Sequence, residues 1–198
     1  DITFTQMSIP NVLTNISCNG GNDGQVVVAP QGGIVPYSYA WSTSANNTPV
    51  ENNLVAGNIT VTVTDGAGCT LDSTFTLTEP AAFNVTIANI TQVTCNGGNN
   101  GQATANVSDV TTTYTYSWNT TPVQATATAT GLTIGTYTVT ATQALSGCTD
   151  TAMVTITQPT AVTIATISPN ITICSGQSTT ITATATGGSN SGYTYTWD

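Results

Sequence analysis

The chain has 198 residues, of which 39% are hydrophobic and only 5% are charged; it contains no Lys, Arg or His, and nine acidic residues give it a formal net charge of −9. A surface without cations cannot neutralise phosphate, which excludes nucleic acid as a partner and argues against anionic membrane surfaces. No apolar run approaches the ~20 residues that cross a bilayer, so we expect no membrane span. Without His or Lys only carboxylates remain as acid–base groups, and few of them recur along the chain, so we expect no enzyme.

The chain repeats itself. Residues 18–24 read CNGGNDG, residues 95–101 read CNGGNNG, and residues 174–178 read CSGQS. Each is followed by a Tyr-x-Tyr-x-Trp segment whose Trp lies 23 residues after the Cys (41 − 18, 118 − 95 and 197 − 174). The Cys residues recur after 77 and 79 residues (95 − 18 and 174 − 95), with seams at Glu79-Pro80 and Gln158-Pro159. This periodicity predicts one repeat over residues 1–80, a second over 81–159, and the first half of a third over 160–198, truncated or completed by further chain.

Alternation of apolar and polar residues predicts short strands. In the first repeat they fall near residues 4–9, 12–17, 25–29, 36–42, 58–64 and 70–78, with a polar stretch around 46–53. In the second they fall at 102–107, 113–118, 135–142 and 149–157. No segment has helical periodicity, and about seven short strands in so small a repeat predict an all-β, immunoglobulin-like sandwich. The Leu-x-x-Gly-x-Tyr spacing of residues 132–137 predicts a tyrosine corner at Tyr137, whereas Ile59 takes that position in the first repeat as a buried apolar residue.

Five cysteines in a small repeat-built chain predict disulfides. Matching the repeats predicts one internal bond in each, Cys18–Cys69 and Cys95–Cys148, and a partner for Cys174 beyond Asp198. Closing a ~50-residue loop stabilises a small domain by about 4 kcal/mol in the chain-entropy model. A metal site is the alternative, but the chain has no His and no Cys-x-x-Cys pair.

Two ligand hypotheses remain beside a structural interpretation. Oxygen-bearing residues in the loop 19–24 and the turn 65–68 suit calcium, although Asn100 and Gln143 replace Asp23 and Asp65 in the second repeat, which favours ordinary turns. Alternating aromatic residues share one strand face and suit either sugar stacking or, as we favour, the core; they are Tyr37, Tyr39, Trp41, Tyr114, Tyr116 and Trp118. We expect no cofactor otherwise.

The order of these motifs resembles the SprB repeat. The resemblance rests on CNGGNDG at 18–24, PYSYAW at 36–41, VTVTDGAGC at 61–69 and TEP at 78–80. It implies repeats of giant Bacteroidota adhesins exported by type IX secretion, including gliding-motility adhesins. It also implies O-glycosylation at Asp-Ser/Thr triplets, which Ser73 and Thr151 match. The second repeat departs from the pattern at Asn100, 109–113 and 143–147, which affects loop-borne functions rather than the fold.

These observations predict a structural or adhesive segment of an extracellular filament on a bacterial cell surface. Its expected partners are neighbouring repeats of one long chain or identical filament subunits, and surface polysaccharide. The alternative is an array of carbohydrate-binding modules in a secreted protein. A third hypothesis is self-assembly, in which a neighbouring chain completes residues 160–198 at an open sheet edge.

Overall fold

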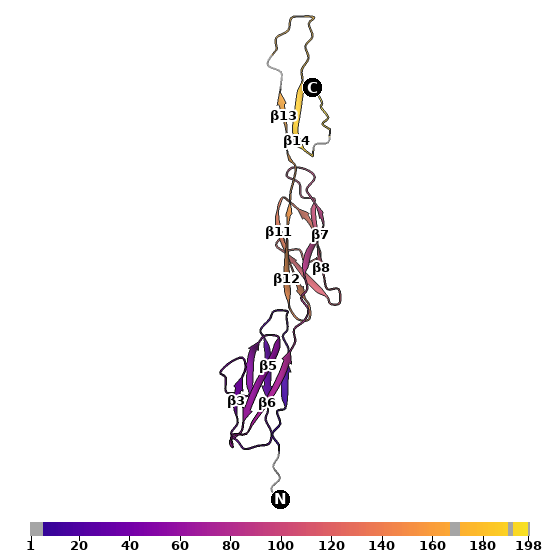
Figure 1. Ribbon diagram of the computed structural model, residues 1–198. Coiled ribbons are helices and arrows are strands. Elements are labelled where there is room, and N and C mark those ends of the chain that lie inside the picture. The colour runs from indigo at the N-terminus through magenta and orange to yellow at the C-terminus, as the bar shows by residue number, and fades with distance from the viewer. Residues whose placement is uncertain (1–5, 167–170, 190–191, 198) are drawn as a thin grey trace. The chain divides into compact units, whose positions relative to one another are not determined.

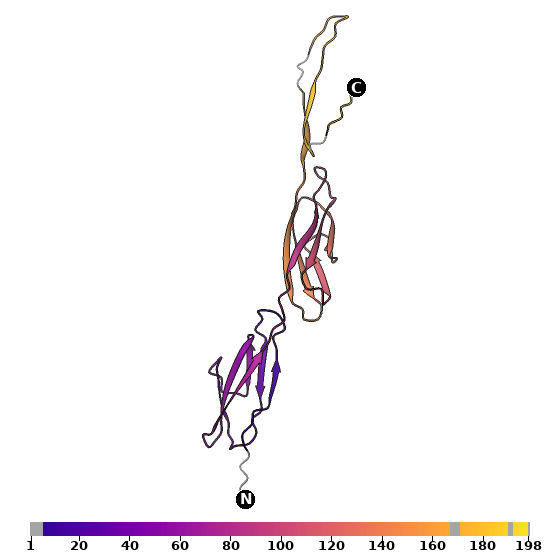
Figure 2. The ribbon, with the colours of Figure 1, turned by 45° about the vertical axis from the view of Figure 1, so that its right-hand side comes forward.

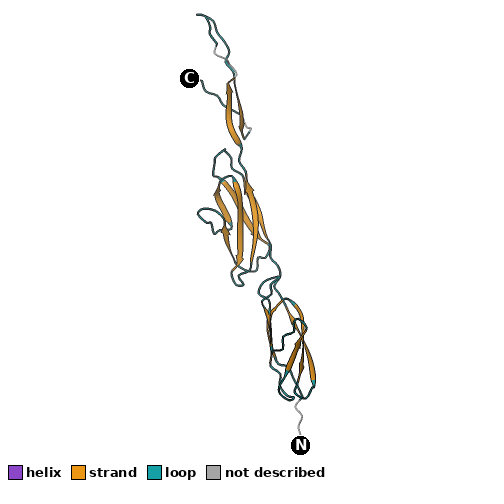
Figure 3. Cartoon of the chain, turned by 90° about the vertical axis from the view of Figure 1, so that its left-hand side faces the viewer, coloured by secondary structure: helices purple, strands orange, loops and turns teal. Residues whose placement is uncertain are grey.

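The computed structural model describes residues 6–166, 171–189 and 192–197. The chain divides into two compact units, Asp1–Ala82 and Phe83–Asp198, and every regular element in its described part is a β-strand (Figure 3). The all-β prediction is confirmed. The described residues contain no helix long and apolar enough to cross a membrane.

The first unit holds a sandwich of two three-stranded antiparallel sheets, with strand orders β1-β2-β4 and β3-β5-β6 (Figures 1 and 2). We call this the first sandwich. Its strands are β1 (Asn11–Thr14), β2 (Gly24–Val28), β3 (Ser38–Trp41), β4 (Val50–Leu54), β5 (Gly57–Thr64) and β6 (Thr70–Leu77). The order matches the A-B-E and C-F-G strands of an immunoglobulin sandwich without strand D.

The second unit repeats the arrangement in its own sandwich, with strand orders β7-β8-β10 and β9-β11-β12. Its strands are β7 (Val85–Thr91), β8 (Gly101–Val107), β9 (Tyr114–Trp118), β10 (Thr128–Leu132), β11 (Gly135–Gln143) and β12 (Thr149–Ile156). A further antiparallel pair, β13 (Thr160–Thr166) and β14 (Ala183–Gly188), belongs to the same unit. These two strands occupy the same places in the third repeat as β7 and β8 do in the second.

Each sandwich has its own core. Alternate residues of β2, β5 and β6 point inward in the first sandwich, where they surround Trp41. The same positions of β8, β11 and β12 surround Trp118 in the second. Because both sheets contribute to one cluster in each case, the two layers are held together by apolar burial.

The structure corrects the predicted strand list. The described part of each complete sandwich has six strands rather than about seven. Residues 4 and 5 of the predicted strand near 4–9 lie outside the described residues, and at 6–9 only an isolated bridge between Ser8 and Gln31 forms. Strand β4 arises within the stretch interpreted as polar, because Glu51 is buried there and accepts hydrogen bonds from Thr43 Oγ1 (2.9 Å) and Asn46 Nδ2 (3.0 Å).

Candidate functional sites

The cysteine loop of the first sandwich, Cys18–Gly24, is a turn held by hydrogen bonds. Gly21 N–H donates to the Cys18 carbonyl (2.9 Å), and Gly20 has φ of 71°, a left-handed conformation that suits glycine. The Asp23 carboxylate accepts a bond from Ser17 N–H (3.1 Å). Hydrogen bonds from Ser17 hold the pKa of Asp23 below its usual range.

The same loop is tied to the seam at the end of its own repeat. The Glu79 carboxylate accepts bonds from Asn19 Nδ2 (2.9 Å) and from Gly20 N–H (2.7 Å). Asn19 Nδ2 also donates to the Pro80 carbonyl (3.2 Å). We call these bonds the loop–seam contact; they explain why an acidic or amide residue followed by Pro recurs at the seam.

The second cysteine loop, Cys95–Gly101, reproduces this geometry with neutral residues. Asn96 Nδ2 donates to the Pro159 carbonyl (3.0 Å) and Gly97 N–H to Gln158 Oε1 (2.9 Å). Asn100 Oδ1 accepts from Thr94 N–H (3.1 Å), as Asp23 does in the first loop. An amide serves as well as a carboxylate at both positions, so the acceptor oxygen matters and the charge does not. This favours the turn interpretation over a calcium loop.

The predicted disulfide pairing is wrong. Cys18 and Cys148 are disulfide-bonded, whereas Cys69, Cys95 and Cys174 are free and exposed. Neither Cys18–Cys69 nor Cys95–Cys148 can therefore form the internal bond that repeat matching suggested. The sequence predicted that all four cysteines of the two complete repeats are oxidised, and this holds for Cys18 and Cys148 but not for Cys69 and Cys95.

The physical reason lies in the length of the last strand of each sandwich. Cys69 directly precedes β6, whereas the chain leading to Cys18 lies beside the far end of that strand, where Ile16 N–H donates to the Thr78 carbonyl (3.1 Å). The 8 residues of β6 span on the order of 25 Å at ~3.3 Å each. A disulfide needs Cα atoms within ~7 Å. β12 separates Cys95 from Cys148 in the same way, since Val93 N–H donates to the Thr157 carbonyl (3.0 Å).

Both tryptophans of the aromatic stripe belong to the cores. Trp118 is 0% exposed and Trp41 6%, and their indole N–H groups donate to the carbonyls of Thr126 and Thr48 (both 3.0 Å). A buried indole offers no face to a sugar ring. The structure therefore gives these two residues a packing position within their sandwiches.

The four tyrosines of the stripe lie at the core margins, half-buried against the same clusters. Tyr37 donates its hydroxyl to the Gly32 carbonyl, and Tyr114 donates to Asp109 (3.0 Å) while its ring packs on Phe83 at 5.1 Å between centroids. Tyr39 and Tyr116 complete the pattern. The predicted tyrosine corner is confirmed, because Tyr137 hydroxyl donates to the Thr133 carbonyl (3.2 Å), and Ile59 is buried at the equivalent position.

The acidic turn at Asp65 is satisfied by its own backbone. Asp65 Oδ1 accepts bonds from the N–H groups of Cys69 and Ala67 (both 2.9 Å), and Oδ2 accepts one from Ile34 N–H (3.1 Å). Hydrogen bonds from Cys69 first, and then from Ile34, hold the pKa of Asp65 below its usual range. Among the described residues no group of three or more His, Cys, Asp or Glu side chains is placed to hold a metal ion.

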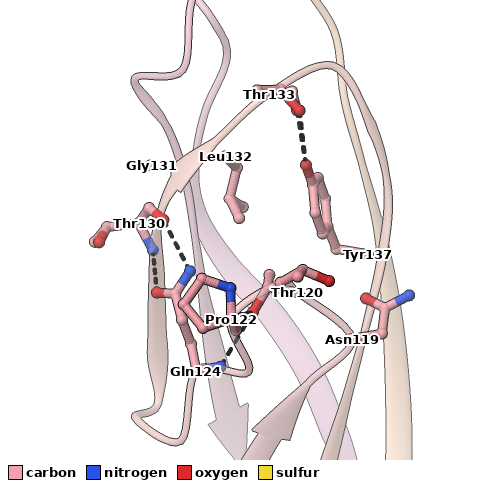
Figure 4. Close-up of a pocket in the computed structure, with 10 residues that line it drawn as sticks. Asn119, Thr120, Pro122, Gln124, Thr130, Gly131, Leu132, Thr133 and Tyr137 are labelled. Carbon is pink, nitrogen blue, oxygen red and sulfur yellow. Dashed lines mark hydrogen bonds between the residues drawn. The ribbon is translucent and has the colours of Figure 1, made fainter.

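A surface hollow in the second sandwich, which the sequence did not predict, lies between Tyr137 and the loop after β9 (Figure 4). Its volume is about 480 Å³. Gln124 crosses one side, where its side chain exchanges two 2.9 Å bonds with the Thr130 backbone, and Thr120 Oγ1 accepts from Gln124 N–H (3.0 Å). These polar groups satisfy one another, and Tyr137 is the only titratable side chain in its lining. The hollow therefore holds no acid–base pair.

The two Asp-Ser/Thr triplets are not at equivalent positions. In the β11–β12 hairpin Thr140 pairs with Thr151, and in the β5–β6 hairpin the equivalent residue Thr62 pairs with Asp72. Thr151 therefore corresponds to Asp72 in strand register, and not to Ser73. A one-residue shift moves a side chain to the other sheet face. Thr151 is accordingly exposed, whereas Ser73 is half-buried on the face that carries Phe75. Both lie on edge strands.

Each complete repeat is thus an immunoglobulin-like sandwich whose recurrent residues serve turns, core and seam. Two segments, residues 11–46 and 87–122, match the sequence model of the SprB repeat. The match confirms the resemblance for the first half of each sandwich, from β1 through β3 and from the third residue of β7 through β9, with the cysteine loops. The hairpins that carry Cys69 and Cys148 lie outside the matched segments.

Curated proteins give no match to this chain. Among solved structures, the three N-terminal domains of the bacteriophage RB49 highly immunogenic outer capsid protein (Hoc) align over 92% of this chain and 68% of that chain, with 18% identity and a TM-score of 0.42. A TM-score below 0.5 does not establish a common fold.

Proposed function

We propose that the chain is a structural segment of a long extracellular adhesin or filament on a bacterial cell surface, exported by type IX secretion and serving attachment or gliding. The observation that carries this proposal is the recurrence of one sandwich in which loops, seams and cores, rather than any ligand group, account for the repeated residues. The match to the SprB repeat supports it, because that repeat occurs in cell-surface proteins.

Repetition of a small folded module is an economical way to build length. Each sandwich has its own core, so stability is close to a sum over modules and the array grows by adding further modules of the same kind. The composition agrees with exposure outside the cell: the chain has no Lys or Arg, the residues after which trypsin-like proteases cut. In this proposal the partners are neighbouring repeats or identical filament subunits.

The carbohydrate-binding alternative has lost its main support, because Trp41 and Trp118 are core residues. Glycan attachment is a separate matter and stays within the proposal. Thr151 is the better candidate for O-glycosylation, since its side chain is exposed on the edge strand β12 while Ser73 is half-buried.

Electron microscopy of intact cells with an antibody raised against this chain tests the proposal. We expect label along thin extended fibres at the cell surface. Label confined to the cell interior, or to compact particles without fibres, would contradict it. Mass spectrometry of the same native protein tests the glycan: a hexose-bearing peptide should contain Thr151.

A further inference from the structure

Two segments in which the second repeat departs from the first lie side by side in the second sandwich. Residues 109–113 lead into β9, and residues 143–147 lie at the end of β11 and in the turn before β12. The backbone joins the two segments, since Ala144 N–H donates to the Thr113 carbonyl (3.0 Å). This contact gathers their polar side chains into one cluster.

The cluster holds a hydroxyl group and a carboxamide in contact. Gln143 Nε2 donates to Thr112 Oγ1 (3.1 Å), and both side chains are half-buried. We propose that this is a self-crosslinking site, in which the Thr112 hydroxyl attacks the Gln143 amide, joins the two side chains by an ester and releases ammonia. The reaction takes place once, within one sandwich, and the protein is its own substrate.

The reacting atoms are close enough for side-chain rotation alone to bring them together. The Gln143 nitrogen is bonded to its carbonyl carbon at ~1.33 Å, so that carbon lies within about 4.4 Å of Thr112 Oγ1. A near-attack geometry needs ~3–3.5 Å. The pairing of Tyr114 with Gln143 in the β9–β11 ladder holds the two segments in place for this approach.

Asp109 is placed to take the hydroxyl proton. Thr112 Oγ1 donates to Asp109 Oδ2 (3.3 Å), while a lone pair of the same hydroxyl oxygen accepts from Gln143. The Tyr114 hydroxyl donates to Asp109 Oδ2 (3.0 Å), and the Thr111 hydroxyl donates to Oδ1 (2.6 Å). Hydrogen bonds from Thr111 first hold the pKa of Asp109 below its usual range, so the group is a carboxylate at neutral pH. A nucleophile, its base and the groups that orient the base are thus in contact.

Ser146 is placed to stabilise the charge that develops on the amide. Its hydroxyl donates to Gln143 Oε1, the oxygen that becomes negative when the amide carbon turns tetrahedral. Gly147 N–H donates to the backbone carbonyl of Gln143 (2.9 Å), and Cys148 N–H donates to Ser146 Oγ (3.3 Å). The turn therefore fixes the donor beside the carbonyl before the reaction begins.

The step balances without an external reagent. The Thr112 O–H proton passes to Asp109 as the new C–O bond forms. The C–N bond of the Gln143 amide then breaks, and the proton passes from Asp109 to the departing nitrogen, which leaves as ammonia. No electrons are gained or lost. Alignment gives the two groups a high effective concentration, and the escape of ammonia into solvent draws the step forward.

The first sandwich provides a comparison within the same chain. Asp65 takes the position of Gln143, since each donates its N–H to the carbonyl of the hairpin cysteine. The Asp65 carboxylate accepts bonds from three backbone N–H groups, those of Ile34, Ala67 and Cys69. A carboxylate has no amide nitrogen to release, so we expect the crosslink in the second sandwich and not at this position of the first.

The ester would close the chain between residues 112 and 143 into a covalent loop that contains β9, β10 and β11. Tension applied along the chain would then bypass this loop. As an extension that rests on the proposed function, a loaded filament could not draw these three strands out of the second sandwich.

The mass of the 198-residue chain tests the proposal. After folding, the denatured and reduced protein should be lighter than its sequence mass by one ammonia. Chymotrypsin, which cuts after Tyr114, Tyr137 and Leu145, should then give residues 84–114 and 138–145 as one joined species. Hydroxylamine, which cleaves esters, should separate them. An unchanged mass, or a loss of ammonia without the joined species, overturns the proposal.

Matched variants separate the chemistry from folding, which circular dichroism checks in each case. Thr112→Val and Gln143→Glu should abolish the loss of ammonia, because the first lacks the hydroxyl and the second lacks the leaving nitrogen. Thr112→Ser should retain it, as should Thr113→Val, whose side chain is exposed. A joined species that persists in Thr112→Val or Gln143→Glu overturns the proposal.

A time course of the joined species tests the base. Asp109→Asn should slow its formation by about 100-fold or more, the usual contribution of a general base; an unchanged rate would overturn the assignment of Asp109. None of these measurements concerns where the chain is found, so their failure would leave the micrographs, and the proposed function, untouched.

Discussion

At the scale of single residues, the repeated positions divide by what surrounds them. Trp41 and Trp118 are held by their cores and by one indole hydrogen bond each. Asp23 and Asn100 differ in charge but accept the same backbone hydrogen bond. Trp recurs in both repeats because the core around it and its hydrogen-bond acceptor need the whole indole. Asp23 and Asn100 can differ because the backbone N–H that each one accepts from needs only an oxygen atom.

Trp118→Ala should destabilise the second sandwich strongly. The substitution removes a fully buried side chain, and such cavities cost about 3–5 kcal/mol, a large part of the 5–15 kcal/mol that stabilises a typical domain. Urea unfolding followed by circular dichroism measures the effect. Leu145→Ala is the control, because Leu145 is 91% exposed and its loss should change little.

Asp65 should make the stability of the first sandwich depend on pH. Its folded pKa is depressed by hydrogen bonds, so its contribution is present above the unfolded value of about 3.9 and is lost as pH falls through the folded pKa. Asp65→Asn places an amide opposite N–H donors and should lower the first melting transition at pH 7. The gap from wild type should close below pH ~4 in calorimetry; a gap that stays constant with pH would contradict this account.

At the scale of elements, each cysteine loop is built from local turn chemistry and one long-range contact. The turn needs Gly20 or Gly97 in a left-handed conformation, with φ of 71° and 75°. The loop–seam contact then joins residues about 60 positions apart, as the separation of Asn19 from Glu79 shows. The turn could be predicted from residue types; the contact could not.

Glu79→Ala should loosen the first loop–seam contact. It removes the acceptor of two hydrogen bonds, from Asn19 and Gly20, and each such bond contributes about 1 kcal/mol in general. We expect faster amide exchange at Gly20 and a modest loss of stability. Glu79→Gln is the matched control, because Gln158 makes the equivalent bond in the second repeat; a loss as large as that of Glu79→Ala would show that charge matters.

At the scale of the whole molecule, the two sandwiches have separate cores. The cluster around Trp41 contains residues of the first unit, and the cluster around Trp118 contains residues of the second. Neither core contains side chains of the other.

Core substitutions should therefore affect one unfolding transition at a time. Leu77 and Ile156 occupy equivalent positions at the ends of β6 and β12 and are 1% and 0% exposed. Leu77→Ala should lower the transition of the first sandwich, and Ile156→Ala that of the second, by about 2–5 kcal/mol each. Calorimetry of the 198-residue chain separates the two cases. Equal shifts of both transitions by either variant would show one cooperative unit.

The sequence by itself determined the repeat, the all-β class, the tyrosine corner and the inward-facing tryptophans. These features depend on spacing and alternation, which act over a few residues or recur with a fixed period. It missed β4 and β10, and it named no strand at the position of β7. β4 and β10 each have two buried positions; the first is Glu51 in β4 and the equivalent Ala129 in β10, which pairs with Ala103 as Glu51 pairs with Val26. From the sequence alone a carboxylate is expected at the surface, because the hydrogen-bond partners that allow its burial are known only from the tertiary structure.

Only the tertiary structure decided which cysteines are oxidised and which threonine is exposed. Repeat matching places Cys18 and Cys69 in one repeat but does not say that β6, 8 residues long, holds them apart. Likewise, similar triplets at Ser73 and Thr151 differ by one residue of register and so point to opposite faces. Sequence spacing is a distance along the chain, whereas bonding and exposure depend on distance and direction in space.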